Sequence, residues 1–214
     1  MSDHEHKPEH LHHFAAPEQQ KESAKLGMWI FLLTEVLFFG GLFCAYAIYR
    51  AWHPEMFHNA HLALDWRMGG LNTLVLVASS VTIALAIRAF QLNQQKPAIG
   101  LMIATVLLAC TFMVVKYFEY AHKFHLGQLP GTFYHYNGIE GTNPHIFFSV
   151  YFMMTGLHGL HVLIGIGVII WLIMRAKRGH FSSKYYTPVE VTGLYWHLVD
   201  LIWIFLFPLL YLIG

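Results

Sequence analysis

Residues 27–43 read GMWIFLLTEVLFFGGLF, an apolar stretch that carries one carboxylate, Glu35, near its middle. Two later stretches have the same character. Residues 155–167 read TGLHGLHVLIGIG and include His158 and His161, and residues 195–207 read YWHLVDLIWIFLF and include His197 and Asp200. An ionisable side chain is expensive in hydrocarbon, so each of these should face protein, a polar partner or a buried cavity. These five residues are therefore the first candidates for a functional role.

The composition is that of a membrane protein. Of the 214 residues, 56% are hydrophobic and 12% are charged, whereas soluble domains are about 45–50% apolar and about 25% charged. The apolar residues occur in blocks of about 20, the length that spans a bilayer core. The formal net charge of +1 gives no indication of nucleic acid or another acidic partner. Cys44 and Cys110 lie inside apolar blocks without metal-ligand spacing and are predicted to be small buried hydrophobic side chains.

The chain divides into a polar tail and a membrane domain. Residues 1–25 are polar, His-rich and without apolar periodicity, so we expect a mobile tail on which a metal would be held only weakly. Residues 26–214 are predicted to form an all-α polytopic domain of five transmembrane helices, at about 27–49, 69–90, 97–119, 146–174 and 192–213. The strips Thr155-Gly156-Gly159 and Gly69-Gly70 are expected to permit close helix approach.

The distribution of Lys and Arg predicts the orientation, because cytoplasmic loops are enriched in them. With the N-terminus inside, nine basic residues lie inside and three outside. The inside residues are Lys7, Lys21, Lys25, Arg88, Lys96, Arg175, Lys177, Arg178 and Lys184, and the outside residues are Arg50, Arg67 and Lys123. The tail is therefore expected in the cytoplasm and the C-terminal end outside.

The candidate residues are predicted to lie at similar depths. Glu35 and Asp200 are each eight residues into their spans, or about 12 Å at 1.5 Å per helical residue. His158 and His161 fall in the inner half of span four, and His197 lies one turn from Asp200 on the same face. Contact among these groups would satisfy all of them at once. Glu35 itself is interpreted as a structural or lipid-cleft residue, with proton transfer as the alternative.

Contacts between or within helices explain the remaining ionisable residues of the spans. His158 and His161 lie on one helix face without thiolate or HExxH spacing, so hydrogen bonding between helices is favoured over haem or metal. Lys116 and Glu119 are spaced i,i+3 near the outer end of span three. They are interpreted as a juxtamembrane ion pair within the helix, or as a lysine that extends to the membrane surface.

Three strings together resemble subunit III of the haem–copper oxygen reductases, the cytochrome c and quinol oxidase family. GMWIFLLTEVLFFGGLF is similar to the family's helix with a buried Glu, here Glu35. VYFMMTGLHGLHVLIG resembles its TGxHGxHV helix, with His158 and His161. GLYWHLVDLIWIFLF resembles its YWHxVDxxWxxLF ending, with His197, Asp200 and Trp203, and the segments at 71–82 and 116–120 also fit. The resemblance covers about residues 25–214.

The resemblance implies the short, five-helix bacterial form in the inner membrane, with a V-shaped arrangement whose cleft holds structural phospholipid near Glu35 and the span-four histidines. It further implies a non-catalytic subunit that flanks the catalytic subunit I and other subunits, and that helps to sustain proton uptake and turnover. Haem and copper would belong to those partners. The residues support this last point independently, because five spans lack histidines on facing helices for two haems and a copper, and no CxxxC motif occurs.

Two alternatives stay within this superfamily: a quinol oxidase subunit III and a nitric-oxide-reductase accessory protein. An alternative of another class is a small proton-coupled transporter that uses Glu35, His158, His161 and Asp200 as a relay. Transporters usually show internal repeats and helices interrupted at the membrane midplane. This sequence shows no internal repeat, and Pro208, the one proline beyond the first residue of a span, lies near the outer end of its span. The oxidase subunit is therefore favoured.

Overall fold

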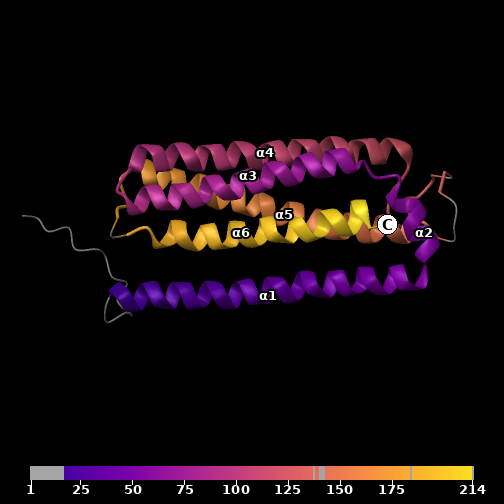
Figure 1. Cartoon of the computed structure of the whole chain (residues 1–214), viewed down its shortest axis with the longest axis horizontal. Helices are drawn as coiled ribbons and strands as arrows, with labels where there is room; N and C mark the ends of the chain where they lie inside the picture. Colours follow the sequence, from indigo (N-terminus) through magenta and orange to yellow (C-terminus); the bar gives the residue numbers. More distant parts are fainter. Residues whose placement is uncertain (1–16, 137, 140–142, 184, 214) are drawn as a thin grey trace, which may run out of the picture.

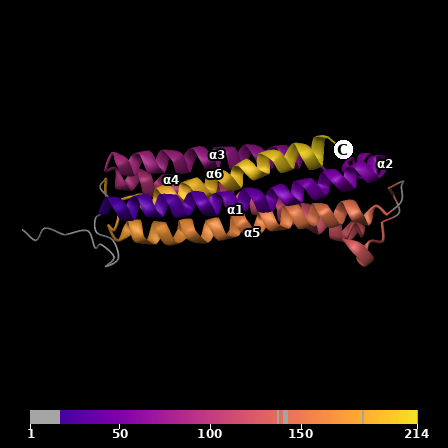
Figure 2. The same cartoon turned by 90° about the horizontal axis from the view of Figure 1, so that it is seen from below.

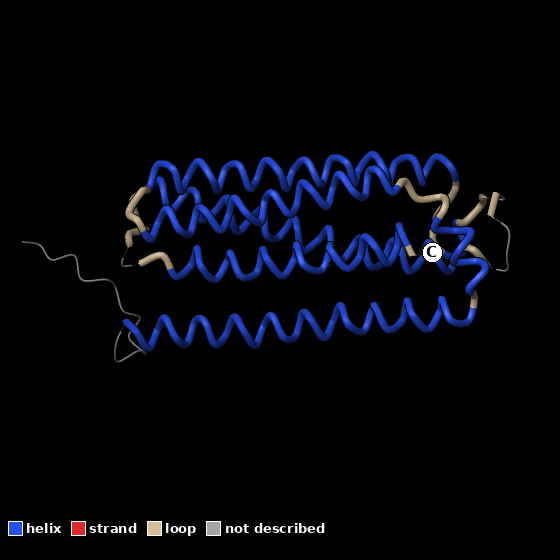
Figure 3. Tube along the Cα trace, in the orientation of Figure 1, coloured by secondary structure: helices blue, strands red, loops and turns tan. Residues whose placement is uncertain are grey.

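The computed structural model describes residues 17–136, 138–139, 143–183 and 185–213. Figure 3 shows helices and loops only, and no β-strand, in this part of the chain. The elements are α1 (Pro17–Trp52), α2 (Pro54–His61), α3 (Trp66–Gln91), α4 (Gln95–Leu126), the short 3-10 helix η1 (Gly131–Phe133), α5 (His145–Lys177), α6 (Thr187–Phe207) and the π-helix η2 (Pro208–Leu212).

Five of these helices are long and apolar enough to cross a membrane: α1, α3, α4, α5, and α6 continued by η2. The shortest comprises 26 residues, which is about 39 Å of helix at 1.5 Å per residue and exceeds a hydrocarbon core of about 30 Å. The all-α class with five spans is therefore confirmed. Because the number of crossings is odd, α1 begins at one end of the bundle and the last residues lie at the other (Figure 1).

The helices extend beyond the apolar blocks from which they were predicted. α1 begins at Pro17, so residues 17–25 of the expected mobile tail are helical. The segment EQQKESAK at 18–25 consists mostly of good helix formers, which continue a helix without apolar periodicity. Its end is anchored, since Lys25 Nζ lies 2.9 Å from Glu190 Oε1 at the start of α6. Residues 1–16, including the tail histidines, lie outside the described residues.

Local sequence explains the other helix ends. The short helix α2, which the sequence analysis did not predict, has Pro54 in its first turn, where a missing N–H has no cost. Asp65 caps α3 by accepting hydrogen bonds from the backbone N–H groups of Arg67 and Met68. α4 ends at Gly127, whose φ of 72° is the left-handed conformation that favours glycine. Only residues 92–94 separate α3 from α4, and the two helices pack side by side.

Four helices, α3 to α6, pack around a shared core, and α1 lies along α5 and α6 (Figures 1 and 2). The ring contacts between α1 and α6 include Phe31 with Tyr195 and Phe43 with Phe205. α1 is the least enclosed of the five, since only 11% of its most apolar window is buried inside the chain. The V-shaped arrangement and its lipid cleft stay predictions.

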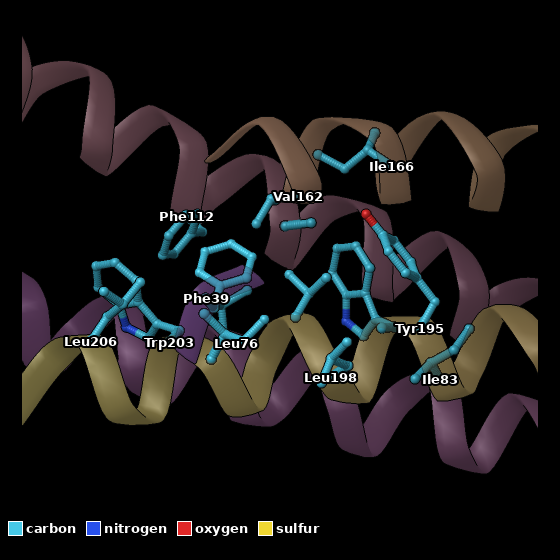
Figure 4. Packing of buried hydrophobic residues seen from close by; sticks show 14 of the residues in the cluster. Phe39, Leu76, Ile83, Phe112, Val162, Ile166, Tyr195, Leu198, Trp203 and Leu206 are labelled. Atoms are coloured by element: carbon cyan, nitrogen blue, oxygen red, sulfur yellow. The ribbon is translucent and has the colours of Figure 1, made fainter. Parts of the chain in front are cut away.

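The core contains many large side chains, and some of them pack directly against the backbone of a glycine. Trp196, Trp203, Phe39 and Phe112 are almost fully buried, and Figure 4 shows part of this cluster. A β-carbon at Gly165 would lie 2.6 Å from the ring of Trp196. At Gly193 the close neighbour is instead the side chain of Ile87, whose Cδ1 would lie 2.5 Å from a β-carbon.

Not every predicted small-residue strip makes such an approach. A β-carbon at Gly69 would lie 2.7 Å from the ring of Phe207, as expected for that strip. At Gly159, by contrast, a β-carbon would meet nothing within 4 Å, and at Gly156 only the Tyr120 hydroxyl at 3.9 Å. This part of the prediction was wrong, because those two glycines do not face a closely packed neighbour. The prediction that Cys44 and Cys110 are buried was also wrong. Both cysteines are exposed on the outside of the bundle.

Candidate functional site

The carboxylate of Glu35 and the imidazole of His161 join α1 to α5. His161 Nε2 lies 3.0 Å from Glu35 Oε2. The two side chains are 16% and 14% exposed, so they are largely shielded by the bundle but still reach its surface. The ring of Phe39, one turn after Glu35, packs edge-on against His161 with centroids 5.2 Å apart. The contact between a carboxylate and an imidazole from different spans is what the matched depths suggested.

The hydrogen bonds of His161 define its protonation pattern. Its Nδ1 lies 2.7 Å from the carbonyl oxygen of Leu157 one turn earlier. A carbonyl oxygen can only accept, so Nδ1 carries a proton. A single further proton then lies between Nε2 and Glu35, which gives either an imidazolium–carboxylate pair or a neutral pair. The backbone of His161 also accepts a hydrogen bond from the hydroxyl of Tyr195 on α6, at 2.9 Å, which fixes this turn of α5.

His158 does not take part in this contact. It is fully buried, and its ring packs between Phe112, with centroids 5.6 Å apart, and Trp203, with centroids 5.2 Å apart. Neither ring nitrogen has a hydrogen-bond partner among the described residues. The expected hydrogen bonding between helices therefore applies to His161 and not to His158. The two histidines are three residues apart on α5. The helix turns between them, so His161 faces α1 and His158 faces the core.

His197 and Asp200 form a separate polar group against α3. His197 Nδ1 lies 2.5 Å from the hydroxyl oxygen of Ser80. Asp200 is 6% exposed, and its Oδ1 has no hydrogen-bond partner within the described part of the chain. Next to them, the indole of Trp196 donates to the Ser79 hydroxyl at 3.0 Å. The structure thus brings these two residues to the α3–α6 contact and not to Glu35.

Lys116 and Glu119 form a buried ion pair. Lys116 Nζ lies 3.0 Å from Glu119 Oε2, and the two residues are only 6% and 5% exposed. The predicted ion pair within the helix is therefore present. The alternative, a lysine that extends to the membrane surface, was wrong, because the ammonium points into the bundle, where its nearest ring is that of Trp203, 4.7 Å away.

Two tyrosines complete this cluster, and the sequence analysis missed both. Glu119 Oε1 accepts hydrogen bonds from Tyr151 at 2.8 Å and from Tyr211 at 2.5 Å, and Lys116 donates to Tyr211 at 2.7 Å. The carboxylate is therefore satisfied by three donors from α4, α5 and η2. The signal was available in principle: a lysine inside a span needs an oxygen acceptor or aromatic rings on the facing helices.

The comparisons with known proteins agree with this architecture. A family model described as cytochrome c oxidase subunit III matches residues 10–214. The chain belongs to the cytochrome c oxidase subunit III family. The match includes all five spans, and with them every candidate residue discussed above.

Relatives that carry the name cytochrome c oxidase subunit 3 cover most of the chain. The protein of Thermostichus vulcanus is 34% identical over 189 residues, which is 88% of this chain and 86% of the relative. That of Synechocystis sp. is 33% identical over 192 residues, with 87% and 74% covered. That of Loxodonta africana is 32% identical over 205 residues, with 91% and 71% covered.

Membership in the cytochrome c oxidase subunit III family implies a multi-pass membrane protein in a complex with the catalytic subunits, as an accessory subunit. Among the described residues, no group of three or more His, Cys, Asp or Glu side chains is placed to hold a metal ion. Several of the polar groups join helices, as Glu35 and His161 do between α1 and α5.

Proposed function

We propose that this chain is the non-catalytic subunit III of a terminal haem–copper oxidase, with cytochrome c as the favoured electron donor, in the inner membrane of a bacterium. In this role it supports assembly of the complex, binds phospholipid and sustains proton uptake by the catalytic subunit I. The observation that carries the proposal is the family match over residues 10–214. Haem and copper then belong to the partner subunits.

The distribution of buried surface supports an intramembrane partner. Only 11% of the most apolar window of α1 is buried inside the chain, against 28% or more for each of the other four spans. α1 therefore offers the largest apolar surface to subunit I or to lipid. Large side chains such as Trp29, Leu33 and Leu37 are exposed along it. The interface with subunit I is accordingly proposed to include α1.

The position of Glu35 and His161 supports a lipid-binding role. This polar pair reaches the surface between α1 and α5, where Phe38 and Leu160 are exposed beside it. Both residues keep a partner within the chain, so the pair does not need a metal or a proton pathway to be stable in the membrane. We therefore place the lipid contact at this surface and assign Glu35 a structural function.

The charges support an orientation with the start of α1 in the cytoplasm. The two ends of the bundle differ in basic residues, and α1 begins at the end that carries Lys96, Arg175 and Arg178 (Figure 1). Because cytoplasmic loops are enriched in Lys and Arg, we propose that this end faces the cytoplasm and that the last residues face the periplasm.

Native purification tests the proposal. The tagged full-length chain is extracted from membranes in a mild detergent, and the product is analysed for haem spectra and companion subunits. We expect co-purification with haem-bearing subunits, whose identity gives the donor class. In a strain without this chain, the initial rate of oxygen reduction should persist while activity declines over successive turnovers. A functional homo-oligomer without haem would show that the transporter alternative is right.

A further inference from the structure

The outer half of α1, which is its C-terminal half, is hydrogen-bonded to the last residues of the described chain. The hydroxyl of Tyr46 donates to the carbonyl oxygen of Leu209 at 2.7 Å. One turn further on, Arg50 Nη2 donates to the carbonyl oxygen of Ile213 at 2.5 Å. The last carbonyl groups of a helix have no partner within it, so they are free to accept from a neighbouring helix. These two hydrogen bonds from α1 therefore end on one short segment, 208–213.

A proline shapes this segment. Pro208 has no N–H and cannot complete the α-helical hydrogen bond to the turn before it. At this point α6 passes into the π-helix Pro208–Leu212, which closes with a hydrogen bond from Ile213 N to the Pro208 carbonyl at 3.0 Å. A π-turn is wider than an α-turn and changes the direction of the groups that follow it. Its carbonyls reach α1 on one side, and Tyr211 reaches α4 on the other.

Tyr211 anchors the segment in the core. It is 3% exposed, donates to Glu119 Oε1 at 2.5 Å and accepts from Lys116 Nζ at 2.7 Å. Its ring has room because Gly69 on α3 lacks a side chain: a β-carbon there would lie 3.2 Å from the ring of Tyr211. Glu119 and Lys116 are both satisfied on α4 at the same time. The segment is thus held by an ion pair that is buried away from α1.

We propose that residues 208–213 connect α4 to the outer half of α1 and thereby set the distance between them, with Tyr211 as the positioning residue. We call this segment the bracket. α1 packs mainly against α5 and α6, so the bracket links it to the buried ion pair on α4. The inner half of α1 is held independently, by Lys25 with Glu190 and by Glu35 with His161. The bracket therefore sets the spacing of the outer half alone. This inference concerns the chain itself and does not depend on the proposed function.

The two cysteines of the chain allow a direct test. Cys44 on the outer half of α1 and Cys110 on α4 are both exposed, so spin labels can be attached to each. The distance between the labels is measured by pulsed electron–electron double resonance on the full-length chain in lipid nanodiscs. Tyr211→Phe keeps the ring and removes only the hydroxyl. We expect the distance distribution to broaden and its main peak to shift by about 1–2 Å, the scale of helix shifts at packed interfaces.

A second label pair and a matched variant make the result specific. In a Leu26→Cys, Cys44→Ser background, the pair 26–110 reports the inner half of α1, and Tyr211→Phe should leave its distribution unchanged. Leu26 is exposed, as this labelling requires. Tyr117→Phe is the control substitution, because Tyr117 lies on the exposed side of α4 and its described contact is a ring contact with Phe118. It should change neither distribution.

The alternative is that Tyr211 only stabilises the fold. In that case Tyr211→Phe would lower the unfolding temperature and leave the 44–110 distribution as in the wild type, and the proposal would be overturned. If Tyr211→Phe does not fold, Tyr46→Phe decides, because it removes the donor to Leu209 from the other side of the bracket. A change at 44–110 without a change at 26–110 supports the bracket, and unchanged distributions at both pairs contradict it.

Discussion

The indole of Trp196 on α6 lies directly against the backbone of Gly165 on α5. A β-carbon at Gly165 would come within 2.6 Å of Cζ3 of the ring, and Trp196 is fully buried. The ring cannot move away easily, because its Nε1 also donates to the Ser79 hydroxyl on α3. One glycine thus fixes the contact of three helices, and it gives the first of five predictions.

Gly165→Ala should destabilise the bundle by about 1–3 kcal/mol, the usual cost of overpacking a filled core. The matched control is Gly167→Ala on the same helix, where a β-carbon meets nothing within 4 Å. Unfolding in mixed micelles measures both. Equal stability of the two variants would mean that the Trp196 contact relaxes at little cost.

Breaking the buried ion pair should cost more. Lys116→Met leaves the Glu119 carboxylate buried without its cation, and removal of one partner of a buried pair typically costs about 3–5 kcal/mol. The double variant Lys116→Met, Glu119→Leu should recover part of this loss, since no unpaired charge remains. The comparison pair is Lys25 and Glu190, which is 36% and 24% exposed and where Lys25→Met should cost about 1 kcal/mol or less. A full double-mutant cycle on the same unfolding assay checks both.

His158 and His161 should respond in opposite ways to replacement by leucine. His158→Leu removes two ring nitrogens that have no partner among the described residues, so stability should change by less than about 1 kcal/mol or rise. His161→Leu deprives Glu35 of its partner and should lower stability by about 1–3 kcal/mol. A large loss with His158→Leu would show that these nitrogens are hydrogen-bonded in the membrane.

Glu35→Ala should weaken retention of the subunit and of its lipid more than it lowers the initial rate of oxygen reduction. The reason is that Glu35 bridges α1 to His161 on α5, the contact that holds the inner half of α1. Subunit content, bound phospholipid and initial rate are measured on the same preparation, with Glu22→Ala, an exposed position on α1, as the control. Immediate and complete loss of turnover in an intact complex would identify Glu35 as an obligatory proton carrier.

The separated subunit should carry no haem, copper or other redox metal. His158 and His161 are spaced three apart on one helix and cannot approach a metal from opposite sides. An optical spectrum and a metal analysis of the purified full-length chain check this. Stoichiometric metal that is lost in His158→Leu or His161→Leu would contradict it.

Much of the fold was predictable from local patterns. The five spans follow from blocks of apolar residues, because the cost of a polar backbone or side chain in hydrocarbon acts on each segment separately. The helix ends were missed where polar residues continue the helix, as from Pro17 to Lys25, since helix propensity has no apolar signature there. The family was recognised from three strings around Glu35, His158 and His197, and the family match confirmed it.

The pairing of side chains was predictable only in part. Similar depth predicted a contact for Glu35 but did not distinguish His161 from His158. A transmembrane helix is apolar on every side, so its sequence does not show which side faces a neighbouring helix. The partners Tyr151 and Tyr211 of the buried ion pair come from α5 and η2, far from Lys116 in sequence. Only the packed bundle brings them together.

The five apolar helices and the membership in the subunit III family could be read from the amino-acid sequence, because hydropathy and motif strings are local properties. Three features could not: Lys116 lies inside the bundle, His158 lies apart from Glu35, and the last turn contacts both α1 and α4. Burial and hydrogen bonding of a polar group in a membrane depend on which helix faces it. That choice is made by side-chain packing among all five helices together.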